Sequence, residues 1–150
     1  MSDPLDELYQ TIIMEHSRHP RHYGKLEAPA QCVEGYNPLC GDQIGACAVV
    51  QGDHLKDVHC FGQGCAISKA SASLMAEALQ GKSVERFHEL FEILQGALKG
   101  DVAALKKLEA EGDLVALAGV RHYPMRVKCA TLGWQSLKAA LEGKSGQLGV

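Results

Sequence analysis

The fold of this chain is decided by residues 44–65, which read IGACAVVQGDHLKDVHCFGQGC. Apolar residues alternate over 44–50 and again over 58–60, and this period of two is typical of half-buried strands. The intervening residues 51–54 contain Gly-Asp and favour a tight hairpin turn. From residue 66 onward the apolar period becomes helical, directly after the Gly-Gln-Gly of residues 62–64. The stretch therefore predicts an antiparallel hairpin that leads into a helix.

The flanking sequence extends this core into an α+β fold. A third strand is predicted around residues 33–36, which makes a small three-stranded antiparallel sheet in the N-terminal half. Several helices are expected to pack against it, and their predicted ranges are 4–17, 66–80, 84–98, 102–110 and 124–142. Asp3, Ser83 and Asp101 are predicted N-caps, and Gly81 and Gly100 are predicted helix stops.

The domain organisation follows from length and composition. A chain of 150 residues with 46% hydrophobic content suits one domain over 1–150 with a single core. Residues 1–18 form its N-terminal helical segment in this interpretation. Residues 143–150 are rich in glycine and lack periodicity, so the sequence predicts a disordered tail there.

Charge and cysteine content narrow the function. A net charge of -3 argues against nucleic acid, because counterion release requires a basic surface. No apolar h-region opens the chain and no stretch approaches the roughly 20 apolar residues of a membrane span, so a cytoplasmic protein without membrane association is expected. In a reducing compartment the six cysteines favour metal ligation or thiol chemistry over disulfides.

Four residues could form one metal site. Cys40 and Asp42 share a loop with Gly41 between them, and loops held by a rigid scaffold often present reactive groups. Cys65 opens a helix, where free N–H groups stabilise a thiolate. Cys129 lies near the start of the last helix. Three thiolates and one carboxylate supply the four ligands that tetrahedral zinc or an iron–sulfur cluster takes.

Each of these residues also has a structural interpretation. The Cys40 loop could be an ordinary turn, and Cys65 could be a small buried residue at a strand–helix junction. Arg126, one turn before Cys129, could support a metal-bound thiolate or could be a solvated arginine. The remaining cysteines, which are Cys32, Cys47 and Cys60, are predicted to be buried structural thiols. Histidines 16, 19 and 22 are predicted to be solvated or to make surface contacts.

Five sequence blocks resemble the IscU/NifU-like family of iron–sulfur cluster assembly proteins. In chain order they are IIMEH (12–16), HPRHYG (19–24), NPLCGD (37–42), GQGCAIS (62–68) and RVKCA (126–130). The resemblance covers nearly the whole chain. It implies that Cys40, Asp42, Cys65 and Cys129 are ligands.

Two departures from the IscU pattern make the SufU branch the closer resemblance. First, 63 residues separate Cys65 from Cys129, which exceeds the IscU spacing, as if an extra helical segment occupied part of 84–118. Second, Lys128 occupies the position at which IscU-type members carry a histidine. The SufU resemblance implies Zn²⁺ as cofactor and a SufS-like cysteine desulfurase as sulfur donor. It also implies apo iron–sulfur proteins or other assembly factors as acceptors.

The mechanism that follows is sulfur transfer rather than conventional enzymatic turnover. Cys40, on its loop, is the predicted persulfide acceptor, and Asp42 is the predicted exchangeable ligand. The alternative is an IscU-type scaffold that builds a [2Fe–2S] cluster and passes it to apo-proteins. A purely structural zinc domain would use the same four residues only to hold the fold.

Overall fold

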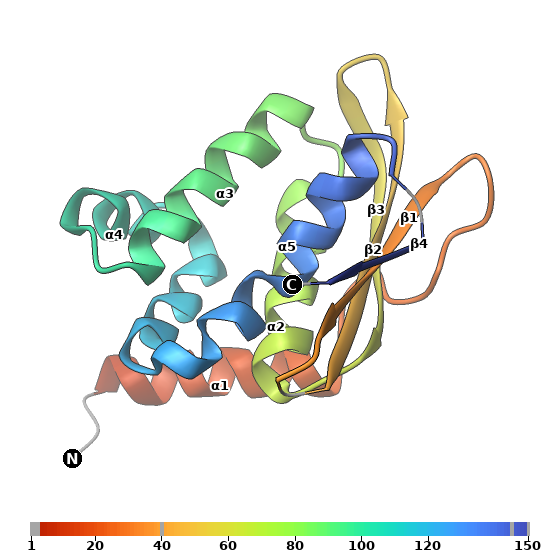
Figure 1. Ribbon diagram of the computed structural model, residues 1–150. Helices are drawn as coiled ribbons and strands as arrows, with labels where there is room; N and C mark the ends of the chain where they lie inside the picture. Colours follow the sequence, from red (N-terminus) through yellow and green to blue (C-terminus); the bar gives the residue numbers. More distant parts are fainter. Residues whose placement is uncertain (1–3, 40, 145, 150) are drawn as a thin grey trace.

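The computed structural model describes residues 4–39, 41–144 and 146–149. A sheet forms one layer, and helices cover one of its faces (Figure 1). The helices in closest contact with the sheet are α2, Ala66–Leu79, and α5, Val127–Leu141. The first helix, α1, Pro4–Arg18, packs against α2 at the lower edge of Figure 1. The α+β architecture predicted from the sequence is therefore confirmed.

The central hairpin forms as predicted. Strand β2, Asp42–Gln51, pairs antiparallel with β3, His54–Gln63, and its other edge pairs antiparallel with β1, Gln31–Asn37. The two-residue turn between β2 and β3 places Gly52 at a φ of 66°, a conformation that glycine adopts without strain. The alternation of apolar residues in the sequence therefore predicted these two strands correctly.

The sheet has four strands and is mixed, so the prediction of three antiparallel strands is corrected. Strand β4, Gly146–Gly149, runs parallel to β1, and the strand order is β3-β2-β1-β4. The prediction of a disordered tail over 143–150 is wrong for these four residues. Pairing with β4 satisfies N–H and C=O groups at the outer edge of β1, and Leu148 adds an apolar anchor by packing against Val33 and Ala139.

Four of the five predicted helices end within one residue of the expected positions, and the fifth, α5, starts three residues late. Besides those above they are α3, Val84–Leu98, and α4, Val102–Glu109. Ser83 caps α3 by accepting a hydrogen bond from Arg86 N at 3.0 Å, and Asp101 caps α4 in the same way. The predicted cap Asp3 lies outside the described residues. Local capping chemistry therefore explains most helix boundaries.

Two 3-10 segments differ from the sequence-based expectation. The predicted helix 124–142 begins instead as a 3-10 turn, η2, Pro124–Arg126, before α5 starts. A longer 3-10 segment, η1, Gly112–His122, was not predicted, and its N-cap Glu111 makes no side-chain capping bond. Leu114, Leu117 and Val120 of η1 are buried, so tertiary packing rather than a local signal holds this segment.

The core lies between the sheet and the helices. Trp134 of α5 is fully buried, and its ring centroid lies 6.1 Å from that of Phe87 and 5.7 Å from that of Phe91. Its Nε1 donates a hydrogen bond to Ser71 Oγ at 3.0 Å, which satisfies the one polar atom of the indole. The segment between Cys65 and Cys129 therefore contributes directly to the main core.

The cysteines that were not predicted as ligands, Cys32, Cys47 and Cys60, differ in their bonding. Cys32 and Cys47 face each other across β1 and β2 and form a disulfide, with Cα atoms 4.1 Å apart. The prediction that both are structural thiols is corrected, because strand register brings together two residues that sequence spacing alone does not pair. Cys60 is buried as predicted, and burial raises the pKa of its thiol to about 12.

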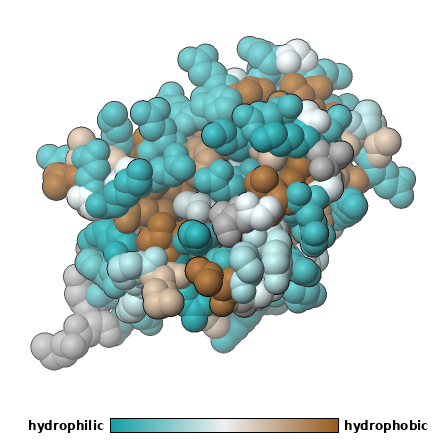
Figure 2. Space-filling view, in the orientation of Figure 1, coloured by the Kyte–Doolittle hydropathy of each residue, from teal (hydrophilic) through white to brown (hydrophobic). Residues whose placement is uncertain are grey.

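Exposed large apolar side chains are spread over several elements, and Leu39, Val102 and Met125 are the most exposed of those described. The face in Figure 2 is mostly hydrophilic, with hydrophobic side chains in small groups between polar ones. None of the described helices combines the length and the apolar character needed to cross a membrane.

Candidate metal centre

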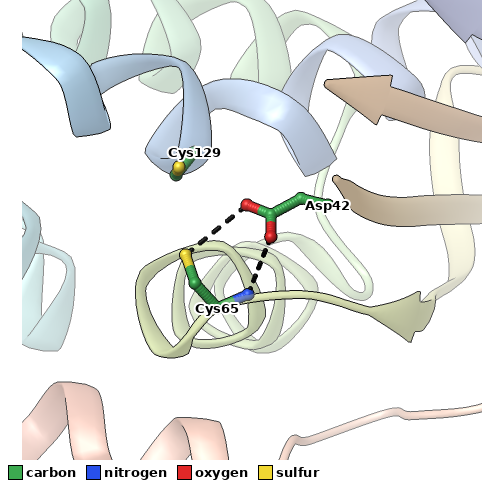
Figure 3. Close-up of side chains that lie close together, drawn as sticks. All are labelled: Asp42, Cys65 and Cys129. Atoms are coloured by element: carbon green, nitrogen blue, oxygen red, sulfur yellow. Dashed lines mark hydrogen bonds between the residues drawn. The ribbon is translucent and has the colours of Figure 1, made fainter. Parts of the chain in front are cut away.

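Three of the four predicted ligands converge at one end of the sheet, where β2 begins and β3 ends. Asp42 begins β2, Cys65 is the N-cap of α2, and Cys129 lies in the first turn of α5. One ligand atom from each residue lies within 4.8 Å of the other two. Figure 3 shows the Asp42 carboxylate pointing between the two cysteines. Residues separated by 23 and 64 positions are thus brought together only by the fold.

Asp42 and Cys65 are directly connected. Asp42 Oδ1 accepts a hydrogen bond from Cys65 N at 2.9 Å, and the Cys65 thiol donates to Asp42 Oδ2 over 3.5 Å (Figure 3). Asp42 is 3% exposed and Cys129 is fully buried, while Cys65 is half-buried. The centre is therefore shielded by protein on most sides, and Cys65 is its most accessible described thiol.

The start of α2 stabilises the Cys65 sulfur. Cys65 Sγ accepts a hydrogen bond from Ser68 N at 3.5 Å and lies 3.4 Å from Ser68 Oγ. A sulfur at this position faces the positive end of the helix dipole. Ser68 was not singled out from the sequence, although its place three residues after an N-cap is the signal that could have found it.

Two glycines shape the approach to Cys65. A Cβ on Gly62 would lie 2.0 Å from Gln43 O, and Gly62 has a φ of 108°. A Cβ on Gly64 would lie 2.5 Å from Ser68 Oγ and 3.2 Å from Asp42 Oδ1. The Gly-Gln-Gly sequence is therefore required because the backbone passes against β2 and then against the Asp42 carboxylate.

Arg126 adds a positive charge beside the thiols. It is exposed, and it ends η2 directly before α5. A hydrogen bond with Cys129 and the charge of nearby Cys65 raise the pKa of Arg126 above its ordinary value. A permanent cation in this position offsets the negative charge that thiolates bring to a site. This contact is compatible with the supporting role predicted for Arg126.

Cys40 lies outside the described residues, so its place in the centre remains a prediction. Its described neighbours are both tied to the end of β1. Gly41 N donates to Asn37 O at 2.8 Å, and Leu39 N donates to Asn37 Oδ1 at 3.1 Å. The side chain of Leu39 is 80% exposed.

The donor set fits a metal ion. Zinc–sulfur bonds of about 2.3 Å place the ligands of a tetrahedral site roughly 3.8 Å apart. The three described ligand atoms already lie within 4.8 Å of one another, so small side-chain movements would close them around an ion. Thiolates select zinc or iron–sulfur clusters, and a single carboxylate is accepted by either. The residues therefore fit either cofactor.

Comparison with known proteins defines the family. Residues 8–130 match the NifU-like N-terminal domain. The chain belongs to this family. It is 38% identical over 138 residues to the iron–sulfur cluster assembly scaffold protein IscU of Streptococcus pyogenes serotype M1, covering 92% of this chain and 85% of that protein. The resemblance to the IscU/NifU-like family is thus confirmed.

A second relative carries a different activity in its name. The zinc-dependent sulfurtransferase SufU of Bacillus subtilis strain 168 is 37% identical over 145 residues, covering 95% of both chains. Among solved structures, the SufU of Fervidobacterium islandicum AW-1, described as a cluster assembly scaffold for the SUF system, superposes with a TM-score of 0.76 at 34% identity. It covers 87% of this chain and 93% of that one. The chain is an iron–sulfur cluster assembly protein with both IscU and SufU relatives.

Proposed function

We propose that this chain is a zinc-bound sulfur acceptor of the SufU type, with Cys40, Asp42, Cys65 and Cys129 as metal ligands. The observation that carries the proposal is the convergence of one carboxylate and two thiols from β2, α2 and α5. A relative named as a zinc-dependent sulfurtransferase, matched over 95% of both chains, supports the choice of zinc. Bound zinc would keep the cysteine thiols deprotonated at neutral pH.

The proposed reaction is one thiol–persulfide exchange. The Cys40 thiolate attacks the outer sulfur of a persulfide on a cysteine desulfurase, forming a new sulfur–sulfur bond. The bond between the outer and inner sulfurs breaks, and the inner sulfur leaves as the thiolate of the desulfurase. The exchange needs no external oxidant or reductant, because the persulfide simply moves from one thiol to the other.

The other residues of the centre have distinct roles in this proposal. Asp42 is the weakest ligand, because a hard carboxylate binds a thiolate-rich centre less firmly than a fourth cysteine would. The exposed Arg126 is placed to attract the anionic persulfide and to offset thiolate charge. Cys65 is positioned by Asp42 and Ser68 and acts as a ligand rather than as the acceptor.

The partners follow from this chemistry. A SufS-like cysteine desulfurase is the proposed donor. Apo iron–sulfur proteins or further assembly factors are the proposed acceptors, and the cytoplasm is the proposed place of the reaction. Two features favour the SufU type. Lys128 replaces the histidine of IscU-type members, and a long segment between Cys65 and Cys129 carries α3, α4 and η1.

A [2Fe–2S] scaffold of the IscU type is the second candidate. It is favoured by the relative of similar identity that is named an IscU scaffold protein. The same four residues would then hold the cluster, which would be passed to apo-proteins as cargo.

Metal and sulfide content of protein purified without oxygen, followed by desulfurase assays, tests the proposal. One zinc per chain, no acid-labile sulfide and a faster desulfurase would support a sulfur acceptor. The variant Cys40→Ser should abolish the acceleration of the desulfurase while leaving the circular dichroism spectrum unchanged. Iron with equimolar sulfide and no rate effect would overturn the proposal in favour of the scaffold.

A further inference from the structure

A second group of metal-ligating side chains lies away from the cysteines. It consists of His16 of α1, Glu77 of α2 and Asp113 of η1. A ring nitrogen of His16 and one carboxylate oxygen from each acid lie within 4.8 Å of one another. Glu77 follows Cys65 by twelve residues along α2, which is about 18 Å of helix. The group is therefore separate from the cysteine centre.

The His16 ring is held in one orientation by protein contacts. Its Nδ1 is hydrogen-bonded to Ser73 Oγ at 2.8 Å, and that oxygen accepts a hydrogen bond from Arg21 N at 2.7 Å. His16 is only 3% exposed, which corrects the expectation that it is a solvated histidine. Fixing one ring nitrogen by a hydrogen bond is how proteins orient the other nitrogen toward a metal ion.

The second nitrogen of His16, Nε2, makes no hydrogen bond to any described residue. No fully buried side-chain nitrogen or oxygen in the described part of the chain lacks a partner, so Nε2 is in contact with solvent. Burial, together with the charge of Arg21, lowers the pKa of His16 and favours the neutral ring that ligates metals. Nε2 is therefore the nitrogen of this nearly buried ring that no described residue occupies.

The charges around His16 favour a cation. Glu77 and Asp113 are both exposed, and Glu15 also contributes negative charge near the ring. Arg21 opposes these acids, and its Nε lies 3.7 Å from Glu77 Oε2. An ion bound here would have to compete with Arg21 for the Glu77 carboxylate.

We propose that His16, Glu77 and Asp113 form a second site for a borderline divalent cation such as Mn²⁺, Fe²⁺ or Zn²⁺. One imidazole and two carboxylates are the donor set that these ions accept, and they do not require thiolates. The three ligands come from three elements, so a bound ion would tie α1 and η1 to α2. This proposal is independent of the sulfur-transfer function and of the occupant of the cysteine centre.

Titration with Mn²⁺ tests the site, because this ion prefers oxygen and nitrogen donors to thiolates. The full chain is titrated as purified, and the six-line electron paramagnetic resonance signal reports free Mn²⁺. About one Mn²⁺ per chain should bind, and Glu77→Gln or Asp113→Asn should weaken binding about tenfold or more. The control is Glu92→Gln, an exposed acid of α3, which should leave the affinity unchanged.

Several outcomes would overturn the proposal. The first is a free Mn²⁺ signal that does not decrease at about millimolar protein. The second is Mn²⁺ binding that survives both Glu77→Gln and Asp113→Asn. The third is an equal loss of Mn²⁺ affinity in Glu92→Gln, which would indicate non-specific electrostatic attraction. Arg21→Gln supplies a test in the opposite direction. Removing one positive charge about 4 Å from a divalent ion across water should tighten binding about thirtyfold. An unchanged or weaker affinity in this variant would show that no ion binds beside Glu77.

Discussion

Replacing Asp42 by alanine should slow the loss of metal from the cysteine centre. In the metal-free protein the Cys65 thiol donates a hydrogen bond to Asp42 Oδ2 over 3.5 Å. That bond cannot exist once a metal has displaced the thiol proton, so it stabilises only the metal-free state. Asp42→Ala removes this stabilisation.

The magnitude follows from the burial of the carboxylate. Asp42 is 3% exposed, and a hydrogen bond to a charged group contributes about 1.5–3 kcal/mol. This free energy corresponds to a factor of roughly 10 to 150 in a binding equilibrium. Loss of the carboxylate ligand opposes the gain, and hard carboxylates bind thiolate centres weakly. We therefore expect zinc release to slow about tenfold, at the lower end of that range.

Release can be followed with a chromophoric zinc chelator added in excess to the zinc-loaded chain. Asp57→Ala is the matched control, since this half-buried aspartate of β3 lies outside the centre. The same variants should be unfolded in urea after metal removal. Asp42→Ala should lower the free energy of unfolding of the metal-free chain by about 1.5–3 kcal/mol. Zinc release as fast as in the unmodified chain, with the control unchanged, would refute the proposed role of Asp42.

Three further predictions address the acceptor, the core and the buried thiol. Cys40→Ser should abolish persulfide uptake from the desulfurase, as read by mass spectrometry of the intact chain; uptake that persists would move the role to Cys65 or Cys129. Leu117→Ala should lower the free energy of unfolding by about 2–5 kcal/mol in urea titrations, because Leu117 is fully buried, and a change below about 1 kcal/mol would contradict the packing of η1. The pKa of Cys60 is raised from 9.0 to about 12 in the folded chain, so the unfolded chain loses this proton at lower pH. The contribution of Cys60 to the free energy of unfolding should therefore be fully present below pH 9 and be lost as the pH rises from 9 toward 12. Cys60→Ala should remove this alkaline loss, and alkylation of Cys60 in the folded chain at pH 8 would count against its burial.

The sequence by itself determined the local elements. The β2–β3 hairpin, the limits of α3 and the start of α4 follow from Gly52, Ser83 and Asp101, whose effects act within a few residues. Turn and cap preferences depend on local sterics and on hydrogen bonds to nearby backbone, so they can be predicted without knowing the rest of the chain.

The sequence also singled out the residues of the candidate centre, first by their chemistry and their places in a loop and at helix starts, and then by their resemblance to a family. Spacings of 23 and 64 residues from Asp42 to Cys65 and from Cys65 to Cys129 match no local ligand motif. The structure brings these three side chains within 4.8 Å because the starts of β2, α2 and α5 meet at one end of the sheet.

Only the tertiary structure decided the fourth strand, the Cys32–Cys47 pair and the surroundings of His16. Strand β4 has no periodic pattern, and it forms by pairing with an edge of β1 that would otherwise lack a partner strand. The disulfide depends on the register of β1 and β2, and the orientation of His16 depends on Ser73, 57 residues later. Each of these contacts joins segments whose separation in sequence carries no local signal, so only the packing of the whole chain determines them.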